Sequence, residues 1–166
     1  FYAGVGLRAE FTELITDYEN FNSVDKHNFN DLFPSVYLEY TLKDNKSLSL
    51  SYSRTIERPG YIELRPYEQK ISETISYIGN IKLKPTYINS TNLSYTYYGD
   101  KLIFISSIFW NNYEDLIQPI SFETTEFNNG IPKIITTVEN IGKLDMYGLS
   151  ITADLQAAKW LNFIGS

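Results

Sequence analysis

The 166-residue sequence contains no cysteine and a single histidine, His27. The missing thiols exclude a disulfide framework and a thiolate metal site, and one imidazole is too little for a histidine-based zinc site. No apolar run approaches the roughly 18–20 residues that a membrane-spanning helix requires. The chain has 14 basic and 20 acidic residues, so its net charge of −6 argues against nucleic acid, whose binding requires concentrated lysine and arginine.

Aromatic residues, by contrast, are abundant: 14 Tyr, 10 Phe and 2 Trp make up 16% of the chain. Mean hydropathy is −0.25, as in an ordinary soluble protein. It also stays low in outer-membrane β-barrels, because only every second residue of a strand faces lipid. Tyrosine suits the aromatic girdles of such barrels. Composition alone therefore leaves open an outer-membrane barrel and an aromatic-rich soluble β-sandwich that binds carbohydrate.

Three short turns interrupt segments in which apolar and polar residues alternate. They lie at Asp44-Asn45-Lys46, Gly99-Asp100 and Ala157-Ala158-Lys159. The stretches between them are long and polar: 12–30, 57–80 and 123–132. Short turns at one end of a sheet and long loops at the other are typical of a transmembrane β-barrel of the outer-membrane type.

The alternation predicts seven strands, at residues 1–15, 31–42, 47–56, 84–98, 101–124, 133–156 and 160–166. We expect an all-β fold, an antiparallel meander of about seven long strands that is a segment of a large transmembrane β-barrel. Single-chain bacterial barrels have even strand numbers, so seven strands do not close. Residues 1–166 are therefore expected to be one partial transmembrane β-barrel domain, with the remaining strands absent.

The turns also predict how neighbouring strands pair. If each turn closes a tight hairpin, the facing pairs are Leu42 with Leu48, Tyr97 with Leu102, and Leu155 with Leu161. Each pairing keeps apolar residues together on one face of the sheet. The register is therefore consistent with the hydrophobic pattern.

The same alternation assigns one face of the sheet to lipid and the other to a wet interior. The residues expected to face lipid include Leu48, Leu50, Tyr95, Phe104, Leu149 and Ile151. The opposite face carries small and polar residues such as Gly4, Ser49 and Asp154, which suit a water-filled lumen. Ile103 and Ile105 are exceptions on the polar face, where something apolar should cover them.

Short motifs follow one another in a fixed order between residues 51 and 149, over most of this pattern. They read Ser51-Tyr52-Ser53-Arg54, Arg58-Pro59-Gly60-Tyr61, Leu64-Arg65-Pro66-Tyr67, Gly79-Asn80-Ile81-Lys82-Leu83-Lys84-Pro85, Asn92-Leu93-Ser94-Tyr95-Thr96-Tyr97, Asn140-Ile141-Gly142-Lys143 and Tyr147-Gly148-Leu149. In order and spacing they resemble the outer-membrane β-barrel family of TonB-dependent receptors that is common in Bacteroidota, in the carboxy-terminal part of the barrel. The signature residues are Arg58, Pro59, Gly79, Asn80, Pro85, Asn140, Gly142, Tyr147 and Gly148. Two residues depart from the family pattern, since Ile81 replaces a proline and Arg65 stands where asparagine is common.

The resemblance implies a receptor of the bacterial outer membrane that imports a scarce nutrient, such as a metal chelate, a vitamin or a glycan. It implies as partners outer-membrane lipid, the rest of the same barrel and its plug, TonB through an absent amino-terminal part, and, as a further candidate, a surface lipoprotein. Nucleic acid is not among them. Two alternatives remain: a complete small eight-stranded barrel with a structural or adhesin role, and a soluble β-sandwich module that binds carbohydrate.

Five residues at the end of the third predicted strand and in the loop after it are candidates for ligand contact: Arg54, Arg58, Tyr61, Arg65 and Tyr67. Guanidinium and aromatic groups at a pore mouth could hold an anionic chelate or stack on a sugar. Alternatively, Arg58 and Arg65 pair with acidic neighbours and order the loop. The prolines and aromatic residues between positions 58 and 80 predict that this loop packs inward or across the barrel mouth.

No pattern predicts catalysis, a bound cofactor or a metal. The first long loop is acidic, with Glu10, Glu13, Asp17, Glu19, Asp25 and Asp31, but the spacing matches no calcium-binding loop. Serines alternate through residues 47–53 without a nucleophile elbow. Gly4 and Gly6 lie within a strand, where glycine permits a neighbour to approach closely. We therefore expect a protein that is not an enzyme and has no cofactor or metal site.

Overall fold

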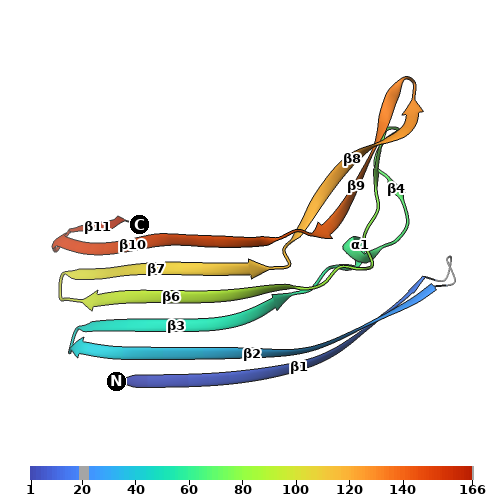
Figure 1. Ribbon diagram of the computed structural model, residues 1–166. Coiled ribbons are helices and arrows are strands. Elements are labelled where there is room, and N and C mark those ends of the chain that lie inside the picture. Colours follow the sequence, from blue (N-terminus) through green and yellow to red (C-terminus); the bar gives the residue numbers. More distant parts are fainter. Residues whose placement is uncertain (19–22, 166) are drawn as a thin grey trace.

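The computed structural model describes residues 1–18 and 23–165. Its main sheet is a seven-stranded antiparallel meander in the order β1-β2-β3-β6-β7-β10-β11 (Figure 1). The strands are β1 (Tyr2–Tyr18), β2 (Ser23–Lys43), β3 (Lys46–Glu57), β6 (Thr86–Tyr98), β7 (Leu102–Glu114), β10 (Lys143–Ala158) and β11 (Leu161–Gly165). The predicted all-β meander of about seven long strands is confirmed.

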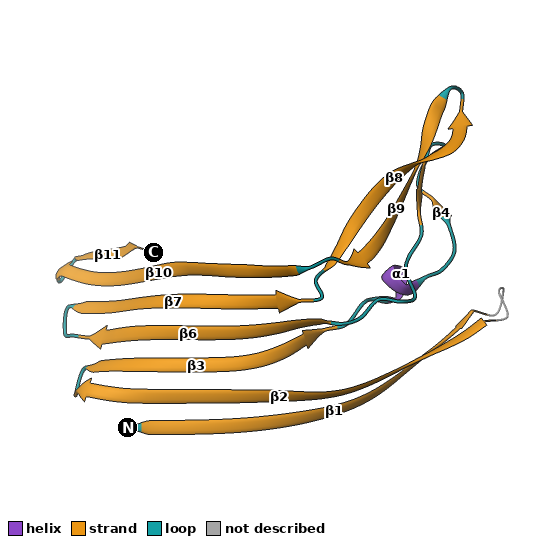
Figure 2. Ribbon diagram, viewed as in Figure 1, coloured by secondary structure: helices purple, strands orange, loops and turns teal. Residues whose placement is uncertain are grey.

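A smaller sheet stands at one end of the main sheet (Figure 2). Its order is β4 (Gln69–Lys70), β5 (Ile75–Tyr77), β9 (Ile131–Asn140) and β8 (Ile117–Asn128). Strands β5 and β9 are parallel, and the other pairs are antiparallel. The four-residue helix α1 (Tyr61–Leu64) lies near the base of this sheet (Figure 1). Within residues 1–18 and 23–165, no helix is long and apolar enough to cross a membrane.

Short turns and long excursions lie at opposite ends of the main sheet (Figure 1). The turns after β2, β6 and β10 share one end. At the other end, the β1–β2 hairpin, the segment 58–85 and the β8–β9 hairpin project from the sheet. The predicted segregation of turn and loop lengths is therefore present in the fold.

Residues 12–30 were expected to form a polar loop, and this expectation is wrong. The β1–β2 ladder continues without a register shift as far as Tyr18, which pairs with Ser23. Phe11, Ile15 and Phe29 are residues with high strand propensity, so the polar residues between them do not end the strands. The first excursion is thus an extended two-stranded arm.

Two of the predicted strands are each two strands. Segment 101–124 divides into β7 and β8, and segment 133–156 divides into β9 and β10, with the members of each pair in different sheets. The breaks lie near Asp115 and Gly142, whose φ angles are 55° and 68°. A residue with positive φ ends the ladder, and here it turns the β8–β9 hairpin away from the wall. The apolar–polar alternation lapses at both breaks, at Glu114-Asp115 and at Asn140-Ile141-Gly142, but each lapse spans only a few residues and was not taken as a strand end.

All three predicted pairings are displaced by two residues. Leu48 lies opposite Tyr40, Tyr97 opposite Phe104, and Leu155 opposite Phe163. Beside the first and third turns, the register shifts between Thr41 and Lys43 and between Gln156 and Ala158. The second turn is wider than predicted and closes with a hydrogen bond from Gly99 N to Leu102 O of 2.8 Å. A shift of two residues keeps every side chain on its face, so the predicted faces are unchanged.

Residues that pair across neighbouring strands form rows that are either mainly apolar or mainly polar. One row contains Ala3, Leu38, Leu50, Leu93, Ile108 and Leu149. The adjacent row, on the opposite face, contains Tyr2, Glu39, Ser49, Ser94, Ser107 and Ser150. Successive residues of a strand point to opposite faces, so the main sheet has one apolar face and one polar face.

Among the described residues, the buried hydrophobic side chains are Phe33 in β2 and a small cluster beside the small sheet. Leu64, Leu83 and Val138 form the cluster, and Leu14, Tyr77 and Ile117 pack against them. The apolar face of the main sheet is open, with Val5 83% and Phe11 81% exposed. A β-sandwich would bury such a face against a second sheet, so the soluble-sandwich alternative does not fit the fold.

Candidate functional site: a folded segment at the rim of the wall

Residues 58–85 fold back over the polar face of the main sheet. Arg58 Nη2 donates hydrogen bonds to Glu10 Oε2 at 2.8 Å and to Thr12 Oγ1 at 3.2 Å. Leu14 packs against the buried cluster that this segment supplies. These three β1 side chains alternate with the apolar ones of the strand, so they lie on its polar face. The contacts agree with the predicted inward packing of the loop.

Arg58 connects the end of β3 to the β1–β2 arm, at a level where β2 and β3 are no longer paired. Backbone pairing between β2 and β3 ends at Ser35 and Ser53. Beyond that point Arg58 reaches the β1–β2 arm and lies 4.0 Å from Asp31 Oδ2. Tyr87 donates a hydrogen bond from its hydroxyl to Asp31 Oδ1 at 2.6 Å. Arg58 therefore orders the loop through acidic neighbours, as the alternative interpretation predicted.

Arg54 is also part of the wall. Its guanidinium carbon lies 4.7 Å from the centre of the Tyr87 ring. The Nε atoms of Arg54 and Arg58 are both buried and have no hydrogen-bond partner among the described residues. Both arginines are half-buried. Arg54 and Arg58, which were predicted to contact a ligand, thus contact other strands of the main sheet. Together with Glu10, Asp31 and Tyr87 they form a cluster that connects β1, β2, β3 and β6, here called the Arg58 clasp.

The other three predicted contacts, Tyr61, Arg65 and Tyr67, come together on the folded segment. The Arg65 guanidinium carbon lies 4.8 Å from the centre of the Tyr67 ring, and its Nη2 donates a hydrogen bond to Gln69 Oε1. Tyr61 is 63% exposed. A hydrogen bond with Tyr61, and then a hydrogen bond with Arg65 and the charge of Arg65, lower the pKa of Tyr67 against the effect of burial. Among the described residues Arg65 contacts an amide and a ring, so its expected pairing with an acidic neighbour is not found.

The signature residues explain how the folded segment stays in place. Asn140 Nδ2 donates hydrogen bonds to the carbonyls of Lys84 at 2.9 Å and Asp115 at 2.7 Å, and its Oδ1 accepts one from Lys84 N at 2.8 Å. Asn80 Nδ2 donates to the carbonyl of Val138 at 3.0 Å. One asparagine thus joins the segment to the base of β8, and the other joins it to β9. The sequence motifs identified both residues but gave no indication of this role.

The remaining signature residues also serve the backbone or the packing. Pro59 and Pro85 are buried. A Cβ added at Gly148 would lie 2.7 Å from the ring of Phe109, its cross-strand partner, so glycine lets that ring lie across the strand. Tyr147 is 80% exposed on the apolar face. Gly6 follows the prediction made for it, because a Cβ there would lie 2.6 Å from Ser35 Oγ.

Glu68 and Lys133 form an ion pair that the sequence analysis missed. Lys133 Nζ lies 2.6 Å from Glu68 Oε1 and 3.4 Å from Glu126 Oε2. Hydrogen bonds from Lys133 and then Ser76 lower the pKa of Glu68, and the bond to Glu68 raises the pKa of Lys133. The pair ties the folded segment to β9. It was not predictable from spacing, since the partners are far apart in the chain.

Acid should therefore loosen the small sheet. The lowered pKa of Glu68 means that its contribution is present above the ordinary value of 4.5 and is lost as pH falls through the folded value. The raised pKa of Lys133 means that its contribution is present below 10.5 and is lost as pH rises through the folded value. We expect amide exchange in β5, corrected for intrinsic rates, to accelerate at about pH 3.5 relative to pH 7. In the Glu68→Gln variant, amide exchange in β5 should be fast at both pH values.

Glu126→Gln is the matched control, since the Glu126 side chain is 74% exposed and lies farther from Lys133. It should leave the exchange of β5 close to that of the unmodified protein. If Glu126→Gln and Glu68→Gln accelerate exchange equally, the pair with Glu68 is not what holds the segment.

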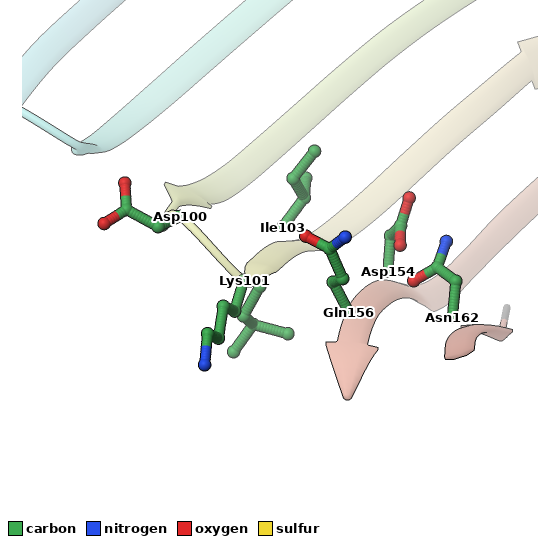
Figure 3. Close-up of a pocket in the computed structure, with 8 residues that line it drawn as sticks. Asp100, Lys101, Ile103, Asp154, Gln156 and Asn162 are labelled. Atoms are coloured by element: carbon green, nitrogen blue, oxygen red, sulfur yellow. The ribbon is translucent and has the colours of Figure 1, made fainter. Parts of the chain in front are cut away.

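A hollow lies at the short-turn end of the polar face, away from the folded segment (Figure 3). Its volume is about 280 Å³, and it is lined by residues 99–103, Asp154, Gln156 and Asn162. Asp100 and Lys101 point away from Asp154 in Figure 3, so the charged groups do not converge. Ile103 pairs with Asp154, which puts it on the polar face, as predicted. In the described ranges, no three His, Cys, Asp or Glu side chains are grouped to hold a metal ion.

The acidic residues expected in the first loop have other places in the fold. Glu10 and Asp31 serve the Arg58 clasp, and Glu13 lies in β1 opposite Asn28. Glu19 lies outside the described residues, as do the side chains of Asp17, Asp25 and His27. The described acidic residues are thus distributed along paired strands instead of gathering in a loop.

Comparison with known proteins agrees with this architecture. A sequence model of the outer membrane protein beta-barrel family matches residues 1–166. No curated protein matches the chain. Several solved structures share the fold. The three described next have sequence identities below 25% to this chain.

The siderophore receptor PirA from Pseudomonas aeruginosa matches with a TM-score of 0.70 and 18% identity, over 96% of this chain and 30% of that one. A mutant of the ferric enterobactin receptor PfeA from the same organism gives 0.65 and 20%, over 96% and 23%. The Serratia marcescens hemophore receptor HasR, solved with its hemophore HasA and heme, gives 0.63 and 12%, over 93% and 28%. The chain spans less than a third of the length of these receptors.

Proposed function

The chain belongs to the outer membrane protein β-barrel family, and from this premise we propose that it is part of the barrel of a TonB-dependent receptor. Its location is the bacterial outer membrane. The proposed receptor is of the type common in Bacteroidota and imports a scarce nutrient, such as a metal chelate, a vitamin or a glycan. This chain would form the carboxy-terminal part of the barrel, and the protein would carry out transport without catalysis.

The observation that carries the proposal is the folded segment at the long-loop end of the wall. Long loops of outer-membrane barrels face the outside of the cell, so this segment would meet a ligand arriving from there. It is held over the polar face by Arg58 and by the two asparagines, and it presents Tyr61, Arg65 and Tyr67. A rigid platform loses little entropy when a ligand binds.

The chemistry of this group favours an anionic, ring-bearing ligand among the nutrient classes. The guanidinium of Arg65 can donate several hydrogen bonds to an anion, and its stacking on Tyr67 keeps it oriented. The exposed ring of Tyr61 offers a face on which an aromatic or sugar ring can stack. An anionic metal chelate satisfies both contacts.

The open edges of the main sheet fit the same proposal. Strands β1 and β11 each have one neighbour in the sheet. Hydrocarbon cannot satisfy unpaired backbone groups, so further strands of the same barrel would complete the wall. A plug in the lumen would cover Ile103 and Ile105 on the polar face. TonB would supply energy through the amino-terminal part of the receptor, and a surface lipoprotein is a candidate partner on the outside.

Uptake assays on cells that produce the full-length receptor test the proposal. Ferric enterobactin, cobalamin and a maltooligosaccharide serve as probes of the three nutrient classes, a metal chelate, a vitamin and a glycan. We expect TonB-dependent uptake of one probe, and Arg65→Ala should weaken its binding about tenfold, the usual loss when a hydrogen bond to a charged group is removed.

Lys70→Ala is the control, because Lys70 is an exposed lysine of the same segment outside the Arg65 group. It should leave uptake unchanged. Uptake that persists without TonB would contradict the receptor assignment. Equal losses in Arg65→Ala and Lys70→Ala would contradict the assignment of the binding group.

A further inference from the structure

A groove opens on the apolar face of the main sheet, close to the short turns. Its volume is about 180 Å³, and it is lined by Lys46, Tyr95, Tyr97, Leu102 and Phe104. These residues lie on the same face as the apolar row that contains Leu50 and Leu93. Tyr95 pairs with Leu48, and Tyr97 pairs with Lys46 and Phe104. The groove therefore belongs to the side of the wall that is expected to meet lipid.

The walls of the groove are held in place by ring contacts and by a glycine. Lys46 Nζ lies 5.4 Å from the centre of the Tyr97 ring, a cation–π contact. The rings of Tyr95 and Phe104 lie 6.4 Å apart in a tilted arrangement. A Cβ added at Gly99 would lie 2.7 Å from the Tyr97 hydroxyl, so the glycine leaves room for the phenol beside the turn. The result is an apolar floor with an ammonium group at one end.

Positive charge gathers at this end of the sheet although the chain as a whole is acidic, with a net charge of −6. The short turns and the residues beside them carry Lys43, Lys46, Lys101 and Lys159, against Asp44 and Asp100. The local excess of lysine would attract an anionic membrane surface. Lys46 differs from the other three in lining an apolar groove.

At the opposite boundary of the apolar face carboxylates outnumber ammonium groups, because Lys143 Nζ is paired with Glu114 Oε1 at 3.2 Å and Asp145 adds a second carboxylate. There Trp110 Nε1 donates a hydrogen bond to Asp145 Oδ1 at 3.0 Å, and Asn112 Nδ2 donates to the same oxygen at 3.0 Å. A carboxylate thus stands beside the aromatic side chain at that boundary. An anionic headgroup would be repelled there and attracted at Lys46, so the two boundaries suit different surroundings.

We propose that the groove is a binding site for an anionic phospholipid of the periplasmic leaflet of the outer membrane. Short turns of outer-membrane barrels face the periplasm, which places Lys46 at the headgroup level of that leaflet. One acyl chain lies along Tyr95, Leu102 and Phe104, and the phosphate accepts a hydrogen bond from Lys46 Nζ. The site depends on the outer-membrane location of the chain and is independent of what the receptor transports.

Native mass spectrometry of the full-length receptor, released from detergent with added lipid, tests this site. The probes are dioleoyl-phosphatidylglycerol and dioleoyl-phosphatidylcholine, which share acyl chains and differ in net headgroup charge. We expect phosphatidylglycerol to be retained in preference to phosphatidylcholine. Lys46→Gln should lower phosphatidylglycerol retention about fivefold, the factor expected for one lysine at a membrane surface. Lys46→Arg, which keeps the charge, should retain the lipid.

Lys159→Gln is the matched control, since it removes a turn lysine that does not line the groove. It should bind phosphatidylglycerol as the unmodified receptor does. Equal retention of the two lipids overturns the anionic headgroup, and equal effects of Lys46→Gln and Lys159→Gln overturn the site. Gly99→Ala tests the geometry with all lysines intact, because it displaces the Tyr97 phenol. Undiminished lipid retention in that variant, with heat-modifiable mobility preserved, also overturns the proposed groove.

Discussion

Replacing Gly79 with alanine is expected to destabilise the folded segment by about 3 kcal/mol, at the upper end of the cost of overpacking. A Cβ at this position would lie 2.5 Å from the carbonyl oxygen of Glu63 and 2.7 Å from both N and O of Arg65. These are backbone atoms, so no side-chain rotation can relieve the contact. The neighbouring Asn80 N donates a hydrogen bond to Glu63 O at 2.6 Å, which fixes the crossing of the two chain segments.

The effect should be seen as faster amide exchange in β5 and faster proteolysis between residues 58 and 80 of the full-length receptor in detergent. Gly60→Ala is the control, because a Cβ there meets only Glu63 Oε2 at 3.6 Å, and φ is −77°, which alanine adopts freely. The control should leave the segment protected. If alanine at position 79 is tolerated as well as alanine at position 60, the close crossing at Gly79 is not required.

Leu48→Arg is expected to destabilise the receptor in a bilayer by about 2 kcal/mol, the lower end of the midplane cost of arginine on the lipid face, because Leu48 lies two residues inside the headgroup level at Lys46. Leu48 is on the apolar face and pairs with Tyr40 and Tyr95. It lies between the short turn and Tyr52, which pairs with Thr91 in the row that includes Trp110. An arginine there could reach water only by distorting the bilayer or its own side chain.

Ser49→Arg provides the comparison from the adjacent position of the same strand. Ser49 lies in the row with Glu39 and Ser94 on the polar face, where a charged side chain meets water. Chemical unfolding of both variants in lipid vesicles should give a large loss of free energy for Leu48→Arg and little change for Ser49→Arg. Equal losses would show that the two faces have been assigned the wrong surroundings.

The faces of the strands could be read from the sequence because the side-chain period of a strand is local. Leu48 and Leu50 alternate with Ser47 and Ser49 whatever the rest of the chain does. The motifs around Arg58-Pro59 and Asn140 were recognisable for a similar reason, since each occupies a few consecutive residues. The long-loop and short-turn ends followed from where the turns lie along the chain.

The register could not be read in the same way. Leu48 pairs with Tyr40 and not with Leu42 because of a local irregularity beside the turn. A displacement of two residues leaves the hydrophobic pattern satisfied, so periodicity cannot distinguish the two registers. The breaks near Asp115 and Gly142 were missed for a different reason, because the lapses in alternation at Glu114-Asp115 and Asn140-Ile141-Gly142 are too short to separate a strand end from a local irregularity.

The candidate site was likewise predictable from the sequence only where its residues are close together in the chain. Arg65 and Tyr67 stack because they are two residues apart on one segment, and their proximity was visible in the sequence. Arg58 was assigned to a ligand or to the loop without a way to choose, and its partner Glu10 lies 48 residues away. The groove at Lys46 and Tyr97 was missed altogether, because the ladder between β3 and β6 brings these residues together.

The class of fold, the apolar and polar faces and the end of the sheet that carries the turns were predictable from the amino-acid sequence, since each depends on residues close together in the chain. The register, the sheet to which each strand belongs and the partners of Arg58, Asn140 and Lys133 became known only from the folded structure. These depend on contacts between distant segments, whose free energies are set by bulges, positive φ angles and close backbone approach. The residue alternation of a strand is insensitive to all three.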